Sequence, residues 1–165
     1  MRVVLAAALA AALAACGQQQ PAEKTASVQP AASLPPQVAP VTSALRAQDG
    51  VYYMDFVRAS GMERFAIEQL GLPQDQAARF SRSMDVQTPS RIVTSNGVEA
   101  LVFVGCMAHN CPNGTSVIAI DTATGDLFAG VKDEEGETIL RPNARLQMLL
   151  TQTSPTQAWS DPVRG

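Results

Sequence analysis

RIVTSNGVEALVFVGC, residues 91–106, is the stretch that decides the fold of this chain. Asn96-Gly97 stands between two runs rich in β-branched and apolar residues, and this dipeptide is the strongest short-range signal for a β-hairpin. The second run is apolar on both faces from Ala100 to Val104, which predicts a central strand. That strand leads directly into Cys106.

Downstream of the hairpin the β-type pattern continues. Three further strands are predicted at residues 116–120, 127–131 and 138–140. The first two of these should form a second hairpin around the turn sequence DTATG. A last helix is predicted after Pro142, with Leu146, Leu149 and Leu150 on one face.

Upstream of the hairpin the pattern is helical. Ser60 and Glu63 have the spacing of a capping box, and apolar residues recur at helical spacing from Met62 to Leu70. A second, short helix is predicted at 73–82. Helices first, consecutive hairpins next and one late helix favour an α+β domain with an antiparallel β-sheet.

The N-terminus has the pattern of a signal peptide. Arg2 precedes an uncharged apolar run of 13 residues, which is too short for a spanning helix of roughly 20 residues. The ending Leu13-Ala-Ala-Cys16 is similar to the lipobox of bacterial lipoproteins, which implies cleavage before Cys16 and acylation of that cysteine. The alternative is an ordinary secretory signal with an incidental cysteine.

Composition divides the remaining chain into a tether and one domain. The expected organisation is a signal peptide (1–15), a lipidated cysteine with a Pro-, Gln- and Ala-rich tether (16–40), and a domain (41–165). Without the signal peptide the chain keeps 11 of its 12 basic residues and all 15 acidic ones, a net charge of −4. This balance argues against nucleic-acid binding and favours a basic partner.

The segment CMAHNC, residues 106–111, holds the chain's only histidine, His109, between two of its three cysteines. If Cys16 carries lipid, Cys106 and Cys111 remain together in an oxidising envelope, where disulfides persist. A zinc site normally needs about four ligands, and this segment offers two thiolates and one imidazole. A redox site more typically has a Cys-x-x-Cys spacing. We therefore expect a disulfide, with no metal and no cofactor.

The same segment, together with GDLFAGV at 125–131, resembles the Ivy family, the periplasmic inhibitors of vertebrate lysozyme, over roughly residues 91–150. The signature loop of that family reads C-K-P-H-D-C. The resemblance implies an antiparallel sheet with helices packed on one side, a protruding loop that enters the lysozyme active-site cleft, and a possible homodimer. The implied target-binding residues are Met107, Ala108, His109 and Asn110, although Lys, Pro and Asp stand in the family at three of these positions.

The chemistry of such a loop follows from the target. A lysozyme-type retaining glycosidase holds two carboxyl groups about 5 Å apart, one protonated and one ionised. One imidazole between them can hydrogen-bond to both, with a charge-assisted bond if it is protonated. Closing a six-residue ring removes on the order of 2 kcal/mol of chain entropy and would aim that imidazole.

The sequence thus predicts an inhibitor with no catalytic activity of its own, lipid-anchored in the cell envelope, that protects peptidoglycan. Its expected partner is a C-type lysozyme or an endogenous peptidoglycan lytic enzyme. Gly17 after the acylated cysteine favours the outer membrane, facing the periplasm, with the inner membrane as the alternative. Two other functions stay open: an envelope scaffold lipoprotein that no longer binds lysozyme, and a thiol redox enzyme.

Overall fold

The computed structural model describes residues 41–154 and Trp159. The predicted signal peptide, the predicted lipidation site Cys16 and the predicted tether up to residue 40 lie outside the described residues. Within the described part, no helix is both long enough and apolar enough to cross a membrane.

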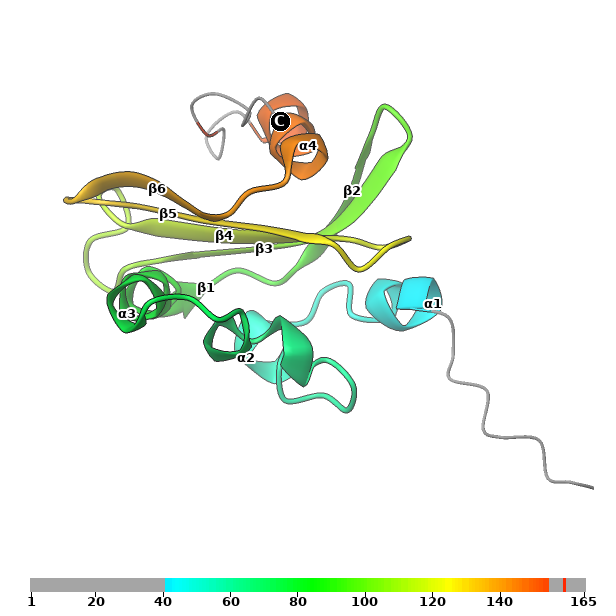
Figure 1. Cartoon of the computed structure of the whole chain (residues 1–165), viewed down its shortest axis with the longest axis horizontal. Helices are drawn as coiled ribbons and strands as arrows, with labels where there is room; N and C mark the ends of the chain where they lie inside the picture. Colours follow the sequence, from blue (N-terminus) through cyan, green and yellow to red (C-terminus); the bar gives the residue numbers. More distant parts are fainter. Residues whose placement is uncertain (1–40, 155–158, 160–165) are drawn as a thin grey trace, which may run out of the picture. The chain divides into compact units, whose positions relative to one another are not determined.

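The core of the fold is a six-stranded antiparallel sheet in the order β1-β3-β4-β5-β6, with β2 also paired to β3 (Figure 1). The strands are β1 (Val86–Gln87), β2 (Arg91–Ser95), β3 (Val98–Cys106), β4 (Thr115–Asp121), β5 (Leu127–Asp133) and β6 (Gly136–Arg141). Because β3 pairs with β1, β2 and β4, the prediction of a central strand is confirmed.

The Asn96-Gly97 hairpin is confirmed as well. Asn96 and Gly97 have φ angles of 49° and 73°, the left-handed pair that a type I′ turn requires. The register that follows places Ser95 opposite Val98 and Arg91 opposite Val102.

Six helical segments accompany the sheet. They are α1 (Val41–Arg46), α2 (Tyr53–Phe56), the 3₁₀ turns η1 (Glu63–Phe65) and η2 (Ile67–Gln69), α3 (Gln74–Arg82) and α4 (Ala144–Thr153). The predictions of a helix at 73–82 and of a helix after Pro142 are confirmed; in α4 the Asn143 side chain accepts a hydrogen bond from the backbone N–H of Leu146 at 3.3 Å.

The single helix predicted from Met62 to Leu70 is wrong. Ala66 is extended, with φ −64° and ψ 140°, and separates η1 from η2; the Ser60 side chain forms no cap there. Phe65 and Ile67 are both buried, although two positions two residues apart point in opposite directions on an α-helix. The break at Ala66 lets both side chains enter the core.

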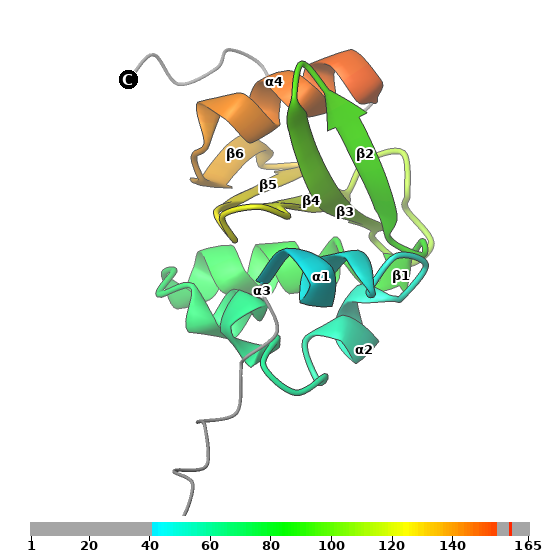
Figure 2. The same ribbon diagram turned by 90° about the vertical axis from the view of Figure 1, so that its right-hand side faces the viewer.

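Both faces of the sheet are covered, because the central strands are apolar on both faces. Leu101, Phe103, Ile118 and Ile120 pack against α1, α2, α3 and the 3₁₀ turns, and the alternate residues pack against α4. Figures 1 and 2 show α4 on the side of the sheet opposite α1, α2 and α3. The α+β class with an antiparallel sheet is confirmed. The expectation that the helices pack on one side of the sheet does not hold for α4, which covers the opposite face.

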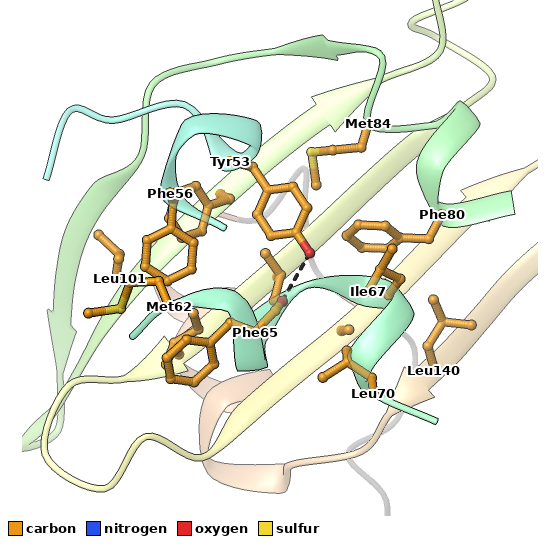
Figure 3. Close-up of a cluster of buried hydrophobic side chains, with 14 of the residues drawn as sticks. Tyr53, Phe56, Met62, Phe65, Ile67, Leu70, Phe80, Met84, Leu101 and Leu140 are labelled. Atoms are coloured by element: carbon orange, nitrogen blue, oxygen red, sulfur yellow. Dashed lines mark hydrogen bonds between the residues drawn. The ribbon is translucent and has the colours of Figure 1, made fainter. Parts of the chain in front are cut away.

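The larger core combines aliphatic side chains with the rings of Tyr53, Phe56, Phe65, Phe80 and Phe103 (Figure 3). The Tyr53 ring meets the Phe103 ring edge-on at 5.5 Å between centroids, and its hydroxyl donates to the Phe65 carbonyl at 3.0 Å. Burial raises the pKa of the Tyr53 phenol. On the opposite face Trp159 is 4% exposed and packs edge-on against Phe128 at 5.8 Å.

Candidate functional site

The connection between β3 and β4 contains the predicted disulfide. Cys106, the last residue of β3, is bonded to Cys111, with 4.8 Å between the two Cα atoms. The prediction of this bridge is confirmed. It closes a small ring at one end of the sheet, directly beyond the strand that is paired with three others.

His109 occupies the tip of this ring. The Asn110 backbone N–H donates to the Met107 carbonyl at 3.1 Å, which makes residues 107–110 a β-turn with His109 at its third position. The φ angle of His109 is 63°, a left-handed conformation that this turn position usually assigns to Gly or Asn. The side chain is exposed to solvent.

Met107 is half-buried and packs against Gly114 across the ring. Its backbone N–H donates to the Gly114 carbonyl at 2.9 Å. A Cβ on Gly114 would lie 2.8 Å from the Met107 Cβ, 3.1 Å from its terminal methyl and 3.4 Å from the Ser83 hydroxyl. Gly114 is therefore the residue that permits Met107 to pack inward against the end of α3.

The four residues for which the family resemblance implies target binding thus differ in exposure. His109 is exposed, whereas Met107, Ala108 and Asn110 are half-buried. The Asn110 amide donates to the Glu134 carboxylate at 3.4 Å, which links the ring to the turn between β5 and β6. The structure therefore brings all four residues into one ring but exposes the imidazole most.

A buried ion pair supports that neighbouring turn. The Arg79 guanidinium, on α3, binds both carboxylate oxygens of Asp133, and it also donates to the Thr138 hydroxyl at 3.0 Å and the Gly136 carbonyl at 3.1 Å. The two charged side chains are 10% and 5% exposed. The hydrogen bonds from Arg79 hold the pKa of the Asp133 carboxyl below its ordinary value.

Sequence reasoning missed this pair. Asp133 begins the acidic run DEE, residues 133–135, which has the composition of a solvated turn, and no local signal connects it to a residue 54 positions earlier. Only the packing of α3 across β5 and β6 reveals that Asp133 is buried.

Among the residues that the structure describes, no three His, Cys, Asp or Glu side chains gather as a set that could hold a metal ion. The ring and its neighbours instead offer one exposed imidazole, in a β-turn closed by a backbone hydrogen bond, and the Glu134 carboxylate that binds Asn110.

The family comparison covers this whole region. A protein-family model described as "Inhibitor of vertebrate lysozyme (Ivy)" matches residues 69–164, which include α3, the complete sheet, the disulfide ring and α4. No curated protein is significantly similar to the chain.

Proposed function

Because this chain belongs to the Ivy family of inhibitors of vertebrate lysozyme, we propose that it inhibits a C-type lysozyme by inserting the disulfide-closed ring 106–111 into the active-site cleft of the enzyme. It binds and blocks the enzyme and catalyses nothing itself. The family match supports lysozyme as the partner; the insertion of the ring is our inference from its geometry.

The observation that carries this proposal is the conformation of His109. An exposed, non-glycine residue in the left-handed region costs of order 1 kcal/mol or more, and such strain gathers at binding sites. The imidazole is exposed at the tip of the turn, where it is accessible to two carboxyl groups about 5 Å apart and can hydrogen-bond to both.

The other ring residues then have supporting roles. Met107 fixes the base of the ring against Gly114, and Asn110 ties its far side to Glu134. The departures from the C-K-P-H-D-C signature remove the Lys and Asp charges from the ring, so the binding energy should depend more heavily on His109 than on its neighbours.

We further propose that the inhibitor acts from the surface of a membrane. The Leu13-Ala-Ala-Cys16 ending supports a lipid on Cys16, and Gly17 supports sorting to the outer membrane with the domain facing the periplasm. There it would meet a lysozyme, or an endogenous lytic enzyme, before the enzyme reaches peptidoglycan.

The test measures inhibition of a vertebrate C-type lysozyme by the wild-type domain and by two variants with a substitution at the tip of the ring. His109→Ala should lose most of the inhibition, because it removes the only imidazole. His109→Asn should lose as much while keeping the residue type that suits the turn, so its melting temperature should equal or exceed that of the wild type.

Three outcomes separate the candidate functions. Equal inhibition by wild type and both variants would refute insertion of His109. No inhibition by any of the three proteins, with all of them folded, would favour an envelope scaffold or a different lytic enzyme as the target. A domain that reduces or oxidises a dithiol substrate, and loses this activity without Cys106 and Cys111, would favour the redox function.

A further inference from the structure

A groove lies between α2, η2 and the segment that joins α3 to β1. Its volume is about 330 Å³. The floor is apolar, and Figure 3 shows Tyr53, Ile67, Phe80 and Met84 pointing toward one another there. These four side chains belong to the larger core, so the floor is held by core packing.

The lip and rim of this groove are exposed. Met54 lines it and is 44% exposed, one of the few large apolar side chains that the described part of the domain leaves in solvent. Glu68 and Asp85 also line it, and both are exposed. Neither carboxylate has an ion-pair partner among residues 41–154 and Trp159. The groove therefore joins an apolar floor to two uncompensated negative charges.

The wall of the groove is continuous with the base of the disulfide ring. A Cβ on Gly105, the residue before Cys106, would lie 2.5 Å from the Met84 sulfur and 2.7 Å from the Met84 Cα. Next to it, the Ser83 carbonyl accepts the backbone N–H of Ser116 at 3.1 Å. The Met84 side of the groove thus lies next to the end of β3 that carries the ring, and a protein that receives the ring in its cleft would extend toward the groove.

We propose that this groove is a second contact for the enzyme that the ring blocks, and that it receives a lysine or arginine side chain from the rim of the enzyme's cleft. The aliphatic stem of such a side chain would lie along Met54, and its cationic head would face Glu68 and Asp85. Long basic side chains divide in this way between apolar surface and charged partners. The inference rests on the proposed function, since it identifies the enzyme by its contact with the ring.

Charge and apolar burial make separable contributions. Substitution of rim charges mainly changes the association rate and its salt dependence, whereas loss of a buried apolar anchor mainly changes dissociation. Glu68→Gln with Asp85→Asn should slow association with a vertebrate C-type lysozyme roughly fivefold at low salt and flatten its salt dependence. Met54→Ser should raise the dissociation constant about tenfold.

The chain offers matched controls for both changes. Met148 on α4 is 51% exposed on the opposite face of the sheet, and Met148→Ser should leave binding unchanged. Asp126 lies in the turn between β4 and β5, at the end of these strands away from the ring, and Asp126→Asn should leave the association rate unchanged to within twofold. Melting temperatures of all variants verify that each is folded.

The outcomes distinguish this inference from the proposed function. If the wild type inhibits, His109→Asn does not, and the two groove variants behave like their controls, the groove inference is wrong and the ring mechanism stands. If Met54→Ser changes the sedimentation of the domain alone but not its affinity for lysozyme, the groove is a contact between copies and the inference is also wrong. If the groove variants bind lysozyme more weakly and the control variants do not, the groove inference is supported.

Discussion

His109 illustrates how a single residue can indicate function when its conformation works against stability. Position three of the turn favours Gly or Asn, and the ring is exposed, so packing does not require an imidazole there. A residue that stabilises nothing locally and is held in a costly conformation is best explained by a contact that the isolated domain does not contain. In the proposed complex, the carboxyl groups of lysozyme would supply such a contact.

At the same scale, Arg79 should be the most costly polar residue to remove. Arg79→Met leaves the Asp133 carboxylate buried without its cation, which should lower the free energy of unfolding by about 3 kcal/mol or more. Arg79→Met combined with Asp133→Leu should recover much of that loss, because neither charge then remains buried. Urea unfolding of the two variants and the wild type measures the difference.

The pH dependence of the free energy of unfolding provides a control for the role of the Arg79–Asp133 ion pair. Because the pKa of Asp133 is lower in the folded protein, its contribution to stability is fully present above the pKa of an unfolded aspartate and is lost as the pH falls through the folded value. The wild type should therefore lose more stability on acidification than the double variant does. A loss below about 1 kcal/mol for Arg79→Met at neutral pH would contradict the buried pair.

At the scale of elements, the sequence predicted the parts whose signals are local. The Asn96-Gly97 turn, the continuous apolar run of β3, and the Cys-His-Cys spacing of the ring each depend on neighbouring residues, and the structure confirms the hairpin, the central strand and the bridge. The two-residue strand β1 and the short helix α2 were not predicted, because segments of this length are too short to show a hydrophobic period.

The elements that sequence reasoning placed wrongly depend on distant contacts. The helix expected at 62–70 breaks at Ala66 because Phe65 and Ile67 must both reach the core beneath them. The inward orientation of Met107 likewise depends on the absence of a side chain at Gly114, across the ring. Hydrophobic spacing alone contains neither constraint.

Removing the Cys106–Cys111 disulfide should distinguish the contribution of a fixed loop conformation from that of the His109 imidazole itself. Cys106→Ser with Cys111→Ser should weaken inhibition, but less than His109→Ala does, because backbone bonds at Met107 and Asn113 and the Met107 side chain still shape the loop. The loss of stability should not exceed about 2 kcal/mol, the entropy of closing so small a ring. Inhibition constants and melting temperatures of the two variants decide the point; a bridge variant as inactive as His109→Ala would mean that the ring itself is the recognised shape.

At the scale of the whole domain, the sheet presents the ring on a rigid support. β3 is hydrogen-bonded to three strands, and its two faces are covered by separate cores, one under α1, α2 and α3 and the other under α4. A loop that begins at the end of such a strand has little freedom to lose on binding. In the proposed complex, this placement would let a small domain direct one imidazole into the cleft of the enzyme.

The remaining prediction concerns the complete chain in its cell. If Cys16 is acylated, the wild-type protein should fractionate with membranes and its intact mass should include acyl chains, whereas Cys16→Ser should be released into the soluble fraction. Cys106→Ser with Cys111→Ser is the matched control, because it removes two cysteines and leaves the lipidation site intact, so it should stay with the membrane. An inhibitor held at the membrane is concentrated where a lytic enzyme must pass, and Cys16→Ser should therefore protect cells from added lysozyme less well than the wild type while inhibiting equally as a purified protein. Membrane association of Cys16→Ser, or a wild-type mass without acyl chains, would show that the cysteine is incidental to an ordinary secretory signal.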